Sequence, residues 1–153
     1  MKRSLGTQLR HLIELLDGAV SDAYEEAGLA YRPRYTPVMR ALMEREPATI
    51  GHIAAAAGIT QPAATQTIAL MIREGIVSSQ AGAADGRQKL ISLTAEGRAL
   101  VPKLVLCWQA TAAAAASLEA ECGLSEAVAS AIDALGAKPY GERIREARAP
   151  LAD

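Results

Sequence analysis

Residues 49–97 read TIGHIAAAAGITQPAATQTIALMIREGIVSSQAGAADGRQKLISLTAEG. The segment contains, in order, a short helix, a turn, a second helix, a strand, a charged loop, a second strand and the start of another helix. Threonine is a good helix N-cap and glycine favours turns and helix ends. The residues that mark the boundaries in this way are Thr49, Gly58, Thr60, Gly75 and Thr94.

The second helix of this segment predicts one buried and one exposed face. Ala64, Ile68 and Met71 recur at helical spacing and are expected to point inward. The outward residues are polar or small and carry no charge: Gln61, Pro62, Thr65, Gln66 and Ala69. Amides and hydroxyls suit hydrogen bonds to base edges, whereas an ordinary solvated face usually carries Glu and Lys. We therefore expect DNA contacts from this face and from the helix cap, at Thr60, Gln61, Pro62, Thr65 and Gln66.

The two strands, near residues 76–77 and 89–93, hold out a slim loop rich in Gly and Ala. Arg87 and Lys89 lie where such a loop could reach DNA, and Asp85 is expected to orient Arg87. The alternative is a simple ion pair between Asp85 and Arg87 within the hairpin. A helix held out by a turn, with a basic loop beside it, can engage adjacent grooves of a duplex. The pattern thus predicts a winged helix-turn-helix that binds DNA.

Charge is distributed in support of this interpretation. The chain has a net charge of −1, but residues 30–93 carry seven basic and four acidic groups, a local excess of +3. Phosphate attraction needs such an excess at the binding surface. Thr49 and Arg34 are further candidates for phosphate contacts, although a solvated arginine on the surface is the commoner case.

Other classes of protein fit less well. Cys107 and Cys122 have no metal-ligand spacing, His11 and His52 lack an accompanying acid cluster, and no cofactor motif is present. The N-terminus has no signal-peptide core, and no segment reads as membrane-spanning, so a cytoplasmic protein is expected. An enzyme is disfavoured because no phosphate loop or Ser, His and Asp set is visible.

Long amphipathic helices flank the central segment. An apolar stripe predicts a helix over residues 4–27, and a second stripe predicts a helix from Thr94 to about residue 121. A further helix over residues 125–136 is expected to turn Val128, Ile132 and Leu135 inward. The first stripe can pack on its own core or on a second copy. The fold class is therefore mainly α with a small β-hairpin wing, with terminal helices expected to form a dimerisation layer.

The order of these elements resembles that of the MarR (multiple antibiotic resistance regulator) family over nearly the whole chain. Two segments carry the resemblance: DGRQKLISLTAEGRAL at 85–100 and GITQPAATQTIALMIREGIV at 58–77. It implies one domain, with dimerisation helices at about 1–30 and 98–153 and a winged lobe at about 31–97. It also implies a homodimer on a pseudo-palindromic operator, acting as a repressor.

The same resemblance implies release by a small aromatic or anionic ligand lodged between the dimer layer and the winged lobe. Residues that could line this pocket are Tyr24, Tyr31, Tyr35 and Trp108, each of which could equally belong to the core. Gln66 and Ser79 stand where the family often has basic residues, which reduces phosphate attraction. The alternative function is therefore a winged-helix adaptor that binds a protein partner and has lost DNA binding; Arg87 and Lys89 argue against it.

Overall fold

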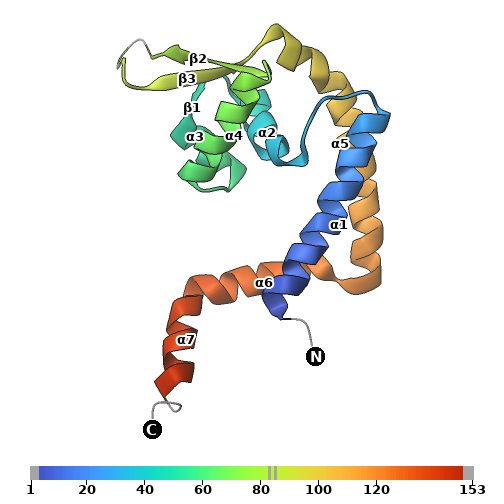
Figure 1. The fold of residues 1–153 in the computed structure, drawn as a ribbon, viewed down its shortest axis with the longest axis vertical. Coiled ribbons are helices and arrows are strands. Elements are labelled where there is room, and N and C mark those ends of the chain that lie inside the picture. Colours follow the sequence, from blue (N-terminus) through green and yellow to red (C-terminus); the bar gives the residue numbers. More distant parts are fainter. Residues whose placement is uncertain (1–3, 83, 85, 150–153) are drawn as a thin grey trace. The chain divides into compact units, whose positions relative to one another are not determined.

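Helices dominate the computed structural model, which describes residues 4–82, 84 and 86–149 (Figure 1). The chain divides into two compact units, Met1–Trp108 and Gln109–Asp153. The elements in chain order are α1 (Leu5–Glu26), a 3-10 turn η1 (Pro33–Tyr35), α2 (Thr36–Glu44), β1 (Ala48–Thr49), α3 (Ile50–Ala57), α4 (Gln61–Arg73), β2 (Val77–Ala81), β3 (Lys89–Leu93), α5 (Ala95–Cys122), α6 (Leu124–Ala137) and α7 (Tyr140–Arg148). The expected class, mainly helical with a small β wing, is confirmed.

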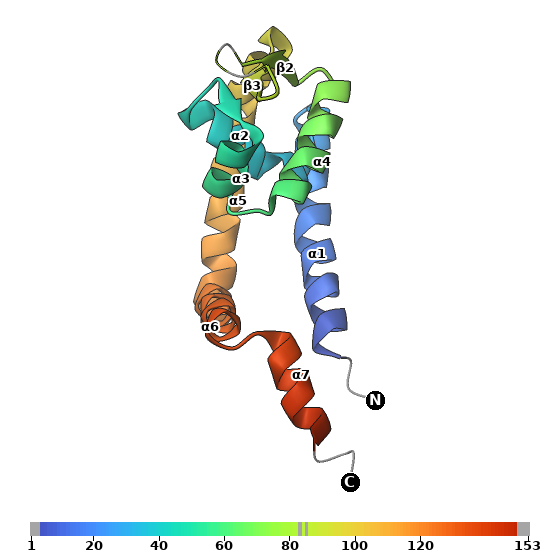
Figure 2. The ribbon, with the colours of Figure 1, turned by 90° about the vertical axis from the view of Figure 1, so that its left-hand side faces the viewer.

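The three helices α2, α3 and α4 form the body of the first unit. Their apolar faces meet in one core, because residues at helical spacing on each helix are buried. Figure 2 shows α3 and α4 joined by a short turn. The most deeply buried side chains of this core include Val38, Leu42, Ile53, Ile68 and Met71. The inward face predicted for α4 is confirmed, since Ala64, Ile68 and Met71 are all buried.

A small antiparallel sheet with strand order β1-β3-β2 lies against these helices. In β2 and β3 the register pairs Val77 with Leu93 at the base and Ala81 with Lys89 near the loop. The hairpin was predicted, but β1 was not. Its two residues are too few to show a period-two pattern, and β1 is a strand only because Ala48 lies opposite Ile91 of β3.

The second helix is shorter than the sequence pattern suggested. The apolar spacing of residues 31–46 alone predicts one helix over that range, whereas α2 begins at Thr36 after the 3-10 turn and ends at Glu44. The difference has a physical reason at Arg32, which precedes Pro33 and is extended with φ −118° and ψ 141°. A residue before proline is disfavoured in the α region, so the helix cannot begin there.

Two flanking helices complete the first unit. α1 has Ser4 as its N-cap, and Tyr24 near its end is its one buried residue among those described. α5 starts at the base of the wing and contributes Leu104 and Trp108 to the core. The indole Nε1 of Trp108 donates a hydrogen bond to the hydroxyl of Tyr24 at 3.0 Å. This buried bond ties α5 to α1.

α5 is also long and apolar enough, by length and composition alone, to cross a membrane. One helix of this kind is weak evidence for a membrane span, and 11% of its apolar window is buried in the single chain. Leu104 and Trp108 are in the lobe core, and Trp108 has a polar partner there. These contacts fix the first half of α5 within the folded first unit.

The second unit contains the end of α5 followed by α6 and α7. Gly123, with φ +59°, separates α5 from α6 as a left-handed glycine does at a helix end. The expectation that Val128, Ile132 and Leu135 point inward is wrong for the single chain, in which they are 41%, 63% and 44% exposed. α6 and α7 contain no buried residue among those described. The periodicity correctly gave an apolar face, but the chain itself does not cover it.

Candidate nucleic-acid interface

The helix-turn-helix is built by two threonine caps and one glycine. The Oγ1 atom of Thr49 accepts a hydrogen bond from the backbone N–H of His52 at 3.2 Å, and Thr60 accepts from Ala63 N–H at 3.3 Å. Both bonds satisfy amides that the first turn of a helix leaves unpaired. Between the helices, Gly58 adopts φ +66° and ψ 30°, a left-handed conformation that suits glycine. These features set the angle between α3 and α4.

The outward face of α4 consists of the residues that the sequence pattern predicted. Gln61, Pro62, Thr65 and Gln66 are all exposed, and none of them is charged. Thr60 is exposed at the N-cap, where its hydroxyl accepts the capping bond. The hydroxyl of Thr65 donates to the carbonyl of Gln61 one turn earlier, at 2.9 Å. Its oxygen therefore remains available only as an acceptor, beside an exposed methyl group.

The wing begins as a regular hairpin formed by β2 and β3. The backbone N–H of Gly82 donates to the carbonyl of Gln88 at 2.7 Å, which closes the hairpin beyond the last strand pair. Arg87 is exposed in the turn after this closure, and Lys89 is exposed at the first position of β3. Asp85 lies outside the described residues. The two basic side chains are therefore carried on a projecting arm of the first unit (Figure 1).

The base of the wing is fixed to α5 by Thr94. Its hydroxyl donates to the carbonyl of Gly75 at 2.6 Å and lies 3.1 Å from that of Ile76, while its oxygen accepts from Gly97 N–H at 3.0 Å. The backbone N–H of Thr94 also donates to Ile76 at 3.1 Å. The helix start is consequently pressed against the strand start, and a Cβ at Gly97 would lie 2.1 Å from the Ile76 oxygen. Thr94 was predicted as a cap, but no local pattern indicates this close approach.

A second anchor of the wing is Glu46, which sequence reasoning missed. Its carboxylate accepts from the backbone N–H of Leu93 at 2.7 Å and forms a short ion pair with Arg98. One side chain thus joins the end of α2, the end of β3 and the first turn of α5. No local pattern predicts this, because the partners are 47 and 52 residues away.

The two candidate phosphate contacts have different surroundings. Arg34 is exposed, and its Nη2 atom donates to the buried hydroxyl of Thr67 on α4 at 3.4 Å. Thr49 is half-buried, and its hydroxyl is engaged as the cap of α3. Arg34 therefore presents a charge at the surface and also contacts α4, whereas the hydroxyl of Thr49 mainly caps α3.

The four aromatic residues considered for a ligand pocket are all buried in the core: Tyr24, Tyr31, Tyr35 and Trp108. The ring of Tyr31 packs edge-on against those of Tyr24 and Tyr35, with centroids 5.0 and 5.6 Å away. Arg40 lies 4.7 Å from the centre of the Trp108 ring as a cation–π partner. Burial raises the pKa of the Tyr31 and Tyr35 phenols, so both stay neutral at physiological pH.

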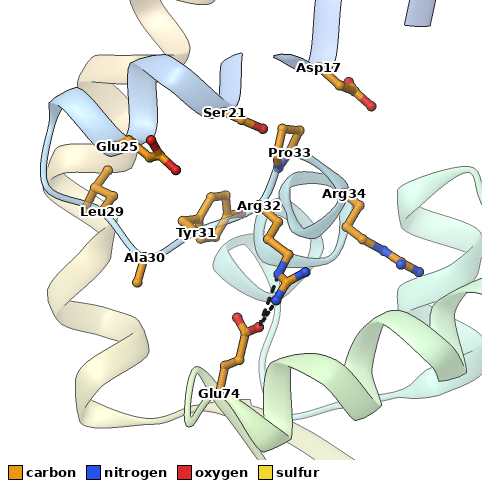
Figure 3. Close-up of a pocket in the computed structure, with 10 residues that line it drawn as sticks. All are labelled: Asp17, Ser21, Glu25, Leu29, Ala30, Tyr31, Arg32, Pro33, Arg34 and Glu74. Carbon is orange, nitrogen blue, oxygen red and sulfur yellow. Dashed lines mark hydrogen bonds and ion pairs between the residues drawn. The ribbon is translucent and has the colours of Figure 1, made fainter. Parts of the chain in front are cut away.

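A cavity of about 780 Å³ lies beside this aromatic cluster (Figure 3). Its lining residues come from α1, the segment after α1 and the end of α4: Asp17, Ser21, Glu25, Leu29, Ala30, Tyr31, Arg32, Pro33, Arg34 and Glu74. Only Tyr31 of the four aromatic candidates is among them. Figure 3 shows Arg32 crossing to Glu74 below the cavity, joined to it by hydrogen bonds. The volume suits a small organic molecule.

Metal binding has no support in the part of the chain that the structure describes. No three His, Cys, Asp or Glu side chains gather there in a way that could hold an ion.

Comparison with known proteins agrees with the geometry. Residues 28–88 match the model of the MarR family. The Mycobacterium tuberculosis transcriptional regulator MosR, solved in complex with DNA, is 26% identical, with 90% of this chain and 99% of that chain covered and a TM-score of 0.68. The Staphylococcus aureus MepR–DNA complex is 17% identical, with 89% and 99% covered and a TM-score of 0.68.

A third similar structure concerns the regulation of DNA binding of Bordetella bronchiseptica BpsR by 6-hydroxynicotinic acid; it is 19% identical, with 74% and 83% covered and a TM-score of 0.55. Among curated proteins, none matches the sequence. The family match falls on the winged lobe, from the end of α1 to the tip of the wing, and the shared fold extends over most of the chain. The winged lobe of this chain therefore matches the MarR family, whose members and solved structural neighbours are DNA-binding transcriptional regulators rather than enzymes.

Proposed function

We propose that this protein is a cytoplasmic repressor that binds a pseudo-palindromic operator as a homodimer and is released by a small ligand. The observation that carries the proposal is the exposed, uncharged face of α4 beside a basic wing. Such a face costs little to desolvate and can hydrogen-bond to base edges, while the wing supplies positive charge for the backbone.

The residues of the α4 face differ in the contacts that they can make with bases. Gln61 and Gln66 each offer an amide, which can donate to and accept from one base in the manner of glutamine with adenine. Thr65 offers only an acceptor and a methyl group, because its proton is engaged by the Gln61 carbonyl. We therefore assign Thr65 to a base that presents a donor or a thymine methyl. Thr60 and Pro62 lie at the helix start, where they are placed to fix the depth of insertion.

On the wing, we assign Arg87 to the minor groove and Lys89 to phosphate. Asp85 is proposed to orient Arg87. In the lobe, Arg34 and Thr49 are proposed as phosphate contacts, with Arg34 the stronger because its guanidinium is exposed. The local excess of positive charge is small, so we expect a modest dependence of affinity on salt.

Dimerisation is supported by the apolar surface that the single chain leaves exposed. On α1, Leu5, Leu9 and Ile13 are 64%, 46% and 56% exposed. On α6, three more aliphatic side chains share this property, and short helices in water are stable mainly through the burial of such a face. We propose that a second copy covers these faces, because uncovered apolar patches of this extent are rare on monomers.

For the ligand, we propose the cavity beside Tyr31, since it combines room for a small molecule with both apolar and charged lining residues. Tyr24, Tyr35 and Trp108 are buried against their neighbours and do not line this cavity. Their proposed part is to support the wall that Tyr31 forms. An aromatic ligand would meet the Tyr31 ring there, and an anionic one would meet Arg32 and Arg34 beside the carboxylates of Asp17, Glu25 and Glu74.

The test is a fluorescence-anisotropy titration of purified protein on DNA from upstream of its own gene, with random duplex as competitor. Arg87→Ala is expected to weaken operator binding, whereas Arg148→Ala, which removes another exposed arginine, on α7, leaves it unchanged. Gln61→Ala and Thr65→Val are expected to cost about 1 to 3 kcal/mol per lost base contact, on the operator only.

Two results would contradict the proposal. Equal affinity for upstream and random DNA, with a folded dimer confirmed by light scattering, would favour the adaptor function. Equal losses on operator and random DNA in the α4 variants would reduce those residues to backbone positioning. Size measurement of the wild-type protein across a dilution series tests the dimer separately from the DNA.

A further inference from the structure

The segment between α1 and α2 carries two arginines that both reach α4. Arg32 donates from Nη2 and from Nε to the same Oε1 atom of Glu74, at 2.8 and 3.2 Å. Arg34 donates to Thr67 at 3.4 Å. Thr67 and Glu74 are seven residues apart and thus lie on one stripe of α4, two turns from each other. The two arginines therefore contact α4, the proposed recognition helix, at two points along one side.

This stripe is not the side that is proposed to read DNA. Gln61 and Thr65 lie on the exposed face, whereas Thr67 is 4% exposed and faces the lobe. Glu74 is the C-cap of α4, immediately before the left-handed Gly75. Contacts at the back and at the end of a helix determine how far and at what angle its front projects.

We propose that Arg32 and Glu74 are positioning residues for DNA binding, which hold the C-terminal end of the recognition helix against the segment after α1. The inference rests on the proposed DNA-binding function and adds to it the group that sets the orientation of α4. Proline fixes one half of the contact, because Pro33 keeps Arg32 in the extended conformation from which its side chain reaches α4. The hydrogen bonds to Glu74 also raise the pKa of the Arg32 guanidinium, which therefore remains charged.

The pair also forms part of the cavity lining, together with Arg34. Whatever occupies that cavity lies against the contact that positions α4. A ligand there can change DNA binding by competing for Arg32, without touching the α4 face itself.

The positioning role and simple electrostatics predict opposite changes in operator affinity for one substitution. Glu74→Gln removes a negative charge from a DNA-binding lobe, which by charge alone strengthens binding to phosphate. If the ion pair positions α4, the same change weakens operator binding, by about three- to tenfold. Glu44→Gln is the matched control, because Glu44 is an exposed acid on α2 of the same lobe. It reports the effect of charge alone.

The experiment measures operator and random-duplex affinity for wild type, Glu74→Gln, Arg32→Glu and the swap Arg32→Glu with Glu74→Arg. The expected result is weaker operator binding for both single variants, recovery to within about twofold in the swap, and, for Glu74→Gln, binding to random duplex that is no weaker than that of wild type. Glu74→Gln with wild-type or higher operator affinity would overturn the proposal. A swap as weak as the single variants would also overturn it.

Amide hydrogen exchange in the last turn of α4 provides a second readout that needs no operator. Faster exchange there in Glu74→Gln, with an unchanged rate in Glu44→Gln, is expected. If wild-type protein shows no operator preference, the proposed function fails and the exchange experiment alone decides the positioning role. Unchanged exchange in Glu74→Gln would then refute it. Circular dichroism and the melting temperature confirm that every variant is folded.

Discussion

Replacing Gly97 by alanine tests how tightly the wing is joined to α5. An ideal Cβ at this position lies 2.1 Å from the carbonyl oxygen of Ile76 and 3.1 Å from its carbonyl carbon. Ordinary carbon–oxygen contacts are about 3.3 Å or longer, so one of the two backbones must move by roughly 1 Å. Gly97 has no positive φ, so the clash, rather than backbone conformation, is the reason that a larger residue is disfavoured.

The expected cost follows from what holds the oxygen in place. The Ile76 carbonyl accepts from the backbone N–H of Thr94 at 3.1 Å and is approached by its hydroxyl at 3.1 Å. Overpacking in a fixed environment costs about 1 to 3 kcal/mol, and weakening two hydrogen bonds adds about 1 kcal/mol each. Alanine recovers up to about 1 kcal/mol through its helix propensity. We expect Gly97→Ala to lower the free energy of unfolding by about 2 to 4 kcal/mol.

Urea unfolding followed by circular dichroism, at one fixed protein concentration, measures this loss. Gly18→Ala is the matched control, because a Cβ at Gly18 of α1 meets nothing within 4 Å. It is expected to be neutral or to stabilise the protein by up to about 1 kcal/mol. If Gly97→Ala is as stable as wild type, the close approach between strand and helix does not constrain this fold and the argument is refuted.

Three further predictions concern contacts described above. Glu46→Ala removes the acceptor for a backbone amide of β3 and the partner of Arg98, so we expect the free energy of unfolding in urea to fall by about 1 to 3 kcal/mol. Glu46→Gln keeps an acceptor and should lose less stability than Glu46→Ala; equal stability of the two variants would count against this role. Tyr24→Phe leaves the buried indole N–H of Trp108 without its partner; we expect a loss of about 1 to 3 kcal/mol and a shift in the emission of this single tryptophan, and unchanged emission would show that the hydrogen bond is not formed. Glu119 accepts the backbone N–H of Ser125 at 2.7 Å, which lowers the pKa of its carboxyl below 4.5. A lowered pKa stabilises the folded state above the unfolded pKa and loses that effect as pH falls through the folded pKa. Wild type should therefore exceed Glu119→Gln in melting temperature at pH 7 and approach it as the carboxyl becomes protonated in acid; a difference that stays constant with pH would contradict the assignment.

The elements that the sequence predicted are those specified by neighbouring residues. Thr49, Thr60 and Thr94 were expected as caps, and each accepts the predicted type of backbone hydrogen bond. The buried side of α4 followed from helical spacing alone. Both features depend on residues within one or two turns, so the local pattern contains the necessary information.

The features that escaped prediction depend on residues distant in sequence. Arg32 and Glu74 are 42 positions apart, and nothing in either neighbourhood indicates the other. The exposure of Ile132 on α6 was missed for a related reason, since periodicity identifies an apolar face but not the molecule that covers it. For the aromatic residues, the sequence did not distinguish a place in the core from a place in the pocket wall. The fold places them in the core, and only Tyr31 also lines the cavity.

The central position of β3 has a mechanical consequence. β3 pairs with the wing strand β2 on one side and with β1, which leads directly into α3, on the other. Bending the wing away from the duplex would break ladder hydrogen bonds on which the helix-turn-helix also depends. The three strands, together with α3 and α4, should therefore behave as a single rigid cassette. A signal that weakens DNA binding must tilt the whole cassette, and grafting residues 32–98, which include the anchors Arg32, Glu46 and Arg98, onto a related scaffold should transfer operator preference.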